Sequence, residues 1–192
     1  EFERYGWQYN SLLIGHGVGA WWHQQEPILR RGSDIVLEEG MVLALEPHKD
    51  HWHVRVLNWA HAEVRDWMFG FIRELCEDYD LAGLELDFMR HCNYFRVDET
   101  TRAQRTAVMT GFIRRVRQLL DRTARDGGHR WLAARLPCYL EPYDPLGLDL
   151  PAMVQAGLEI VNLSPYYLAV QQTDLARICR QVPGAAVHLE LT

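Results

Sequence analysis

Several features that mark common protein classes are scarce or missing in this chain. Its four cysteines are widely spaced, with no C-x-x-C pair. This predicts reduced, mostly buried thiols rather than a disulfide framework or a zinc site. It has no run of 18 apolar residues and no signal peptide, so we expect no membrane partner. The compartment stays open, and the reduced thiols favour the cytoplasm.

Lysine is nearly absent, and basic residues do not cluster. Only Lys49 is a lysine, and 20 basic residues stand against 26 acidic ones, giving a net charge of -6 in a mixed pattern. This argues against a nucleic-acid partner. No G-x-G-x-x-G or G-K-[ST] turn follows an expected strand, which argues against nucleotide binding.

The first 56 residues consist of short apolar runs separated by turns, which predicts a small β-rich piece. Ser11–Ile14 is an apolar run ended by Gly15–Gly19, a stretch whose glycine content predicts a loop. The run at 41–45 predicts a strand that ends before Glu46-Pro47.

Three motifs follow one another in this region: G-H-G-x-G at 15–19, H-x-x-E-P at 23–27 and G-M-x-x-x-x-E-P at 40–47. In this order they resemble the C-terminal half of the pita-bread metallopeptidases, the methionine aminopeptidase and Xaa-Pro dipeptidase family. The resemblance implies that His16 and Glu46 are metal ligands and that His23 hydrogen-bonds the substrate. The implied cofactor is a divalent metal, Mn, Co or Zn. The family's two aspartate ligands precede these motifs, and residues 1–10 contain no aspartate.

From about Leu57 the pattern becomes an alternation of strands and helices. Residues 61–78 and 99–125 carry apolar side chains at helical spacing. Four strands are expected, at Leu81–Phe88, Trp131–Leu136, Leu158–Leu163 and Ala185–Leu191. This alternation predicts an α/β fold with adjacent parallel strands, either an open sheet or part of a (β/α)8 barrel.

The first of these strands ends in two acids. Because side chains alternate along a strand, Glu85 and Asp87 point to the same face. Carboxylates at the carboxyl end of a parallel strand lie where α/β folds place their chemistry. The alternative is a structural ion network in which Arg90 or Arg135 neutralises them.

The segments 83–91 (G-L-E-L-D-F-M-R-H), 133–137 (A-A-R-L-P) and 157–167 (G-L-E-I-V-N-L-S-P-Y-Y) resemble bacterial glycosyl-hydrolase-like barrel proteins, grouped loosely with family 10 glycosidases. This resemblance implies a partial (β/α)8 (TIM) barrel over 57–192, acting on a carbohydrate without a cofactor. We assign Glu85 or Asp87 as acid/base and Glu190 as nucleophile or base. The expected substrate-binding residues are Arg90, His91, Arg135, Asn162, Tyr166, Tyr167 and His188.

The leading hypothesis is therefore a glycoside-hydrolase-like domain at 57–192 preceded by a pita-bread-like fragment at 1–56. The two resemblances meet near Val56, where neither family is complete, which predicts a chimera or a fragment. The alternative is a metal-dependent aminopeptidase or Xaa-Pro dipeptidase that takes further ligands from a partner chain. A third interpretation is an inactive carbohydrate-binding fragment. An oligomer would cover the incomplete barrel.

Overall fold

The computed structural model describes residues 15–18, 25–30, 32–45, 57–89, 93–165 and 173–190. The chain divides into two compact units, Glu1–Arg55 and Val56–Thr192.

The N-terminal unit contains a three-stranded antiparallel sheet in the order β2-β1-β3. Its strands are β1 (Gly15–Gly17), β2 (Gln25–Leu29) and β3 (Leu43–Leu45). The prediction of a glycine loop was wrong at its start, because Gly15–Gly17 is the central strand. A Cβ at Gly15 would lie 2.4 Å from Ala44 O, so glycine is what allows β3 to pair this closely. The apolar run at 11–14 lies outside the described residues.

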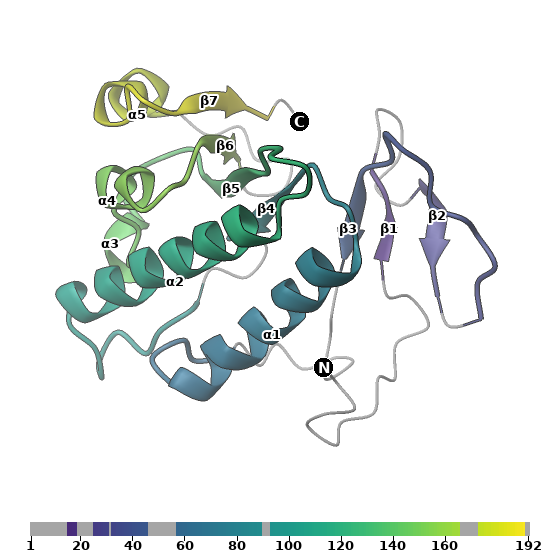
Figure 1. Cartoon of the computed structure of the whole chain (residues 1–192). Helices are drawn as coiled ribbons and strands as arrows, with labels where there is room; N and C mark the ends of the chain where they lie inside the picture. The colour runs from purple at the N-terminus through teal and green to yellow at the C-terminus, as the bar shows by residue number, and fades with distance from the viewer. Residues whose placement is uncertain are drawn as a thin grey trace. The chain divides into compact units, whose positions relative to one another are not determined.

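The C-terminal unit alternates helices and parallel strands (Figure 1). Its elements are α1 (Ala62–Asp78), β4 (Gly83–Asp87), α2 (Arg102–Thr123), β5 (Trp131–Pro137), α3 (Tyr143–Leu146), α4 (Leu150–Gln155), β6 (Ile160–Ser164), α5 (Leu175–Gln181) and β7 (Ala186–Leu189). The strands pair in the order β4-β5-β6-β7, and every pair is parallel. This confirms the prediction of a mixed α/β fold with adjacent parallel strands.

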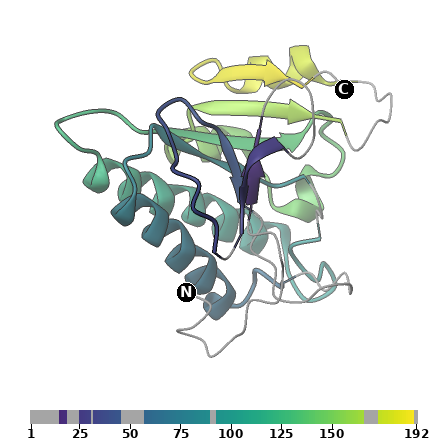
Figure 2. The same cartoon turned by 90° about the vertical axis from the view of Figure 1, so that its right-hand side faces the viewer.

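Side-chain alternation on the central strand separates a core face from a polar face. Leu132, Ala134 and Leu136 of β5 are buried in the hydrophobic core, together with residues of α2 and α4. Trp131 and Arg135 point to the opposite face, where Trp131 is half-exposed. Figure 2 shows α1 and α2 together on one side of this sheet. Polar side chains from strands that are far apart in the sequence therefore lie on the opposite face of the sheet.

Helix ends follow their local chemistry. Thr101 and Gln104 form a capping box at the start of α2, since each side chain bonds the other's backbone N–H. The N-cap of α5 is Asp174, and its carboxylate accepts a hydrogen bond from Leu140 N instead of capping the helix. The four-residue helix α3 was not predicted, because one turn shows no periodicity.

Within the described ranges the parallel sheet has four strands, and the barrel interpretation stays a prediction. Cys76 and Cys138 are buried, as expected, whereas Cys179 is exposed. No helix in the described part of the chain combines the length and apolar character needed to cross a membrane.

Candidate functional site at the carboxyl end of the parallel sheet

A row of polar side chains crosses the four parallel strands near their carboxyl ends. The register places Asp87 beside Arg135, Arg135 beside Asn162, and Asn162 beside His188. Since paired residues of adjacent strands point to the same face, these four side chains project together. Four residues from four separate segments of the chain, between Asp87 and His188, thus lie in one row.

Three more polar residues adjoin this row. Glu85 lies two residues before Asp87 on β4, Ser164 ends β6, and Glu190 directly follows β7. We call the seven residues the sheet-end cluster: Glu85, Asp87, Arg135, Asn162, Ser164, His188 and Glu190. The six among them that the sequence predicted as catalytic or substrate-binding are therefore brought together.

Arg135 is the centre of the cluster, because each of its nitrogens bonds a different partner. Nε donates to Glu190 Oε2 at 2.9 Å, and Nη1 donates to Asp87 Oδ2 at 3.1 Å. Nη2 donates to Ser164 Oγ at 2.8 Å. One guanidinium thus bridges acids of β4 and of the residue that follows β7. Of the two acids in the ion network considered above, Arg135 bonds Asp87, whereas Glu85 is bonded by Asn162.

A second chain of hydrogen bonds joins Glu85, Asn162 and His188. The Asn162 amide donates to Glu85 Oε2, and its Oδ1 lies 3.1 Å from His188 Nδ1. The amide oxygen can only accept, so His188 donates through Nδ1, and in the neutral imidazole the lone pair is then on Nε2. This network therefore fixes both the amide orientation and the histidine tautomer.

Asp87 and Glu85 belong to different hydrogen-bond networks and have different surroundings. Both Asp87 oxygens are engaged, since Oδ1 accepts from the backbone N of Met89 at 2.8 Å. Desolvation raises the pKa of Glu85, the hydrogen bond from Asn162 and the charge of Arg135 lower it, and the charges of Asp87 and Glu190 raise it. The net effect is a raised pKa, so Glu85 is the acid of the cluster that is suited to hold a proton.

Arg135 keeps its charge in this environment. Desolvation lowers the pKa of its guanidinium, but the charge of Asp87 and the bonding to Glu190 outweigh that effect and raise it. The cluster therefore contains one permanent cation and three carboxyl groups.

Ser164 is the cluster member that sequence reasoning missed. It is fully buried, and its hydroxyl bonds Arg135 and donates to Pro165 O at 3.1 Å. The available signal was its spacing, because Ser164 lies two residues after Asn162 and so shares its face.

Several predicted site residues cannot be placed. The following lie outside the described residues: Arg90, His91, Tyr166 and Tyr167 of the carbohydrate site, and His23 and Glu46 of the metallopeptidase motifs.

His16 is the one predicted metal ligand that the structure describes. It lies in β1, is 4% exposed, and its Nδ1 is 2.9 Å from Gly17 O. If Nδ1 carries the proton that this carbonyl accepts, Nε2 has the lone pair that a metal ligand needs, so the residue fits that role. Among the residues that could be searched, no three His, Cys, Asp or Glu side chains gather into a complete metal site.

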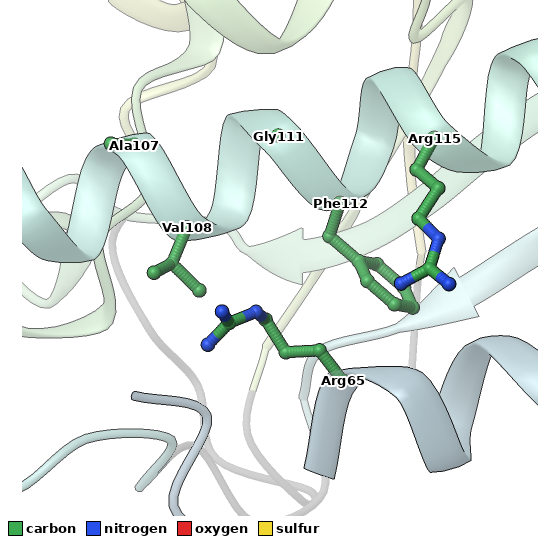
Figure 3. Close-up of a pocket in the computed structure, with 6 residues that line it drawn as sticks. All are labelled: Arg65, Ala107, Val108, Gly111, Phe112 and Arg115. Atoms are coloured by element: carbon green, nitrogen blue, oxygen red, sulfur yellow. The ribbon is translucent and has the colours of Figure 1, made fainter. Parts of the chain in front are cut away.

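A separate hollow of about 330 Å³ lies between α1 and α2, lined in part by Arg65, Gly111, Phe112 and Arg115 (Figure 3). Its arginines already have partners. Arg65 donates to the carbonyls of Trp59 and Ala60, and Arg115 pairs with Asp66. The hollow contains none of the predicted site residues.

Comparison with known proteins bears on the N-terminal part. A model of metallopeptidase family M24 matches residues 1–83. No curated protein matches the chain. The match includes α1 and ends at Gly83, the first residue of β4, so the whole sheet-end cluster lies beyond it. The N-terminal part of the chain is thus similar to the M24 metallopeptidases, in agreement with the motifs of residues 15–47.

Proposed function

We propose that residues 1–83 supply part of an M24-type metallopeptidase site, in which His16 and Glu46 ligate a divalent metal. The observation that carries this proposal is the family match, which covers all three motifs. When bound, such a metal provides an activated water for hydrolysis of a peptide bond. His23 would hydrogen-bond the substrate in this site. The substrate class is a short peptide, as for aminopeptidases and Xaa-Pro dipeptidases.

The geometry of β1 supports the role of His16. Its ring is buried, and the bond to Gly17 O favours the tautomer in which Nε2 can bind a metal. Leu45, which pairs with Gly15 in the neighbouring strand, directly precedes Glu46 in the sequence. The strands Gly15–Gly17 and Leu43–Leu45, which contain parts of the first and third motifs, are therefore neighbours in one small sheet.

Two ligands hold a transition metal weakly, because tight sites use three or more. Residues 1–10 contain no aspartate, so the two aspartate ligands of the family are not among them, and a tight site needs carboxylates besides Glu46. The test is titration of the purified chain with Mn²⁺, Co²⁺ or Zn²⁺. Weak metal binding that is lost in His16→Ala supports the proposal. Equal metal binding by wild type and His16→Ala refutes it.

A second candidate function is favoured by the sheet-end cluster. We propose that it binds a carbohydrate and acts as a glycosidase-like site, with Glu85 as general acid and Glu190 or Asp87 as the second carboxylate. Glycoside hydrolysis needs one protonated and one ionised carboxyl on opposite sides of the bond. The raised pKa of Glu85 suits the first role, and the pairing of Asp87 and Glu190 with Arg135 suits the second.

The second candidate is tested by assaying the full chain on aryl glycosides. Glu85→Gln keeps the shape of the side chain but removes its acid, so turnover should fall by ~10²–10⁴. Glu77→Gln, on the exposed side of α1, serves as the matched control. Turnover by Glu85→Gln within a few-fold of wild type would show that Glu85 is not the acid.

A further inference from the structure

The hollow between α1 and α2 combines an apolar wall with positive charge. Figure 3 shows Val108 and Phe112 directed from α2 towards α1, while the guanidinium of Arg65 reaches from α1 towards Val108. Within the described part of the chain no carboxylate lines this hollow. Its lining consists of four uncharged residues of α2 and one arginine from each helix: Ala107, Val108, Gly111, Phe112, Arg65 and Arg115.

Both guanidinium groups are held in place by the protein. Nη1 of Arg65 donates to two backbone carbonyls of the loop before α1, at 2.6 and 2.9 Å. Arg115 pairs with Asp66 through its Nη1, and its Cζ lies 3.8 Å from the centroid of the Phe69 ring. The two cations are therefore oriented before any ligand arrives, which lowers the entropy lost on binding.

The free side of Arg65 is suited to receive an anion. Among the described residues, Nε and Nη2 of Arg65 have no hydrogen-bond acceptor, and no acid forms an ion pair with this residue. The acceptors of its Nη1 are uncharged carbonyls, whereas Arg115 is neutralised by Asp66. The N–H groups on one side of a planar guanidinium match the two oxygens of a carboxylate. The hollow thus offers one unneutralised cation with a paired set of donors.

Gly111 keeps the hollow open. It lies in the interior of α2, where glycine disfavours the helix relative to alanine. Packing does not require a glycine there, because a Cβ at this position would meet no atom within 4 Å. The residue therefore weakens the helix without relieving a clash, and its effect is to leave space between Arg65 and the wall of α2.

We propose that this hollow binds a small carboxylate with an apolar body. The carboxylate pairs with Nε and Nη2 of Arg65, and the apolar body lies against Val108 and Phe112. The volume of about 330 Å³ is at the lower end of the range for small-molecule sites, which favours a compact ligand. The site uses no residue of the two functions proposed above and does not depend on either.

The test is a binding titration of the full chain by NMR, with phenylacetate, phenylacetamide and inorganic phosphate as probes. Phenylacetate should bind with a Kd on the order of 1 mM, in keeping with its small size. Phenylacetamide lacks the charge and phosphate lacks the apolar body, so each should bind at least about tenfold more weakly. Absence of phenylacetate binding would overturn the proposal, as would equal binding of either other probe.

Variants locate the binding in the hollow. Gly111→Leu fills the space with a better helix former, so binding should be lost while the melting temperature does not fall. Arg65→Met should weaken phenylacetate binding by about tenfold, to the level of phenylacetamide. Arg114→Met, at an exposed position of α2 outside the hollow, is the matched control and should bind as wild type does. Wild-type affinity in Gly111→Leu or in Arg65→Met would overturn the proposal.

Discussion

Two arginines five residues apart illustrate how position decides what a charged residue does. Arg135 lies on the polar face of β5, whereas Arg130, just before β5, is only 3% exposed. Arg130 donates to the carbonyls of Cys76 and Tyr79 at the end of α1 and pairs with Asp80. It therefore ties the end of α1 to the beginning of β5.

Replacing Arg130 should accordingly destabilise the C-terminal unit. Arg130→Met removes the donors of buried carbonyls, so we expect the free energy of unfolding to fall by about 2–3 kcal/mol. Arg125→Met, at an exposed position in the preceding turn, should change it by less than about 0.5 kcal/mol. Urea denaturation followed by circular dichroism measures both. Equal effects of the two substitutions would show that the buried contacts of Arg130 contribute nothing.

The raised pKa of Glu85 predicts a pH dependence. A carboxyl group whose pKa is higher in the folded than in the unfolded state stabilises the fold when protonated, and this contribution is lost as the pH rises through the folded pKa. Glu85→Gln imitates the protonated form at every pH. We therefore expect it to be more stable than wild type near neutral pH and equal to it below the ordinary pKa of 4.5.

Thermal denaturation of both proteins at several pH values measures this difference. If Glu85→Gln is less stable than wild type at neutral pH, the carboxylate is stabilised by its surroundings and the assigned direction is wrong. Glu77→Gln, at an exposed position of α1, should show no such crossover.

At the scale of elements, the sequence was informative where one face of a strand is buried and the other polar. The alternation on β4 predicted that Glu85 and Asp87 share a face, and the register places Arg135 beside Asp87 on that face. The pairing of Arg135 with Glu190 depends on how β7 follows β6 in space, which the sequence pattern alone does not give. The stretch Gly15–Gly17 was predicted to be a loop because glycine-rich stretches usually form loops. In this protein the missing side chain of Gly15 instead permits close pairing with β3.

The turn after α3 provides a prediction at this scale. Gly147 has a φ of 72°, and a Cβ there would lie 2.7 Å from the backbone of Arg105. Gly127 has a nearly equal φ of 69° but open space around it. Gly127→Ala should cost about 1 kcal/mol for the left-handed backbone alone. Gly147→Ala should cost clearly more, because the turn must also move away from α2.

Chemical denaturation of the two glycine variants tests the packing of the α3 turn against α2. Since the backbone strain is matched, the difference between them reports the contact with Arg105. Equal destabilisation would mean that α3 does not pack against α2 as described.

At the scale of the whole chain, the family match and the compact units do not share a boundary. The units divide between Arg55 and Val56, while the M24 match continues through α1 to Gly83. The metallopeptidase motifs lie in the first unit and the sheet-end cluster in the second. The two proposed sites therefore belong to different parts of the chain and can be tested separately in the full-length protein.

The central claim is that the N-terminal part supplies metallopeptidase-type metal ligands, and Co²⁺ titration of the full chain tests it most directly. The absorption spectrum of bound Co²⁺ reports its ligands without any assay of activity. Wild-type protein should bind about one Co²⁺ weakly, with a Kd above roughly 10 µM because two ligands are too few for a tight site. His16→Ala should abolish the signal, and His61→Ala, at an exposed position before α1, should leave it unchanged. Tight binding that survives His16→Ala, or no binding to the wild-type chain, would contradict the claim.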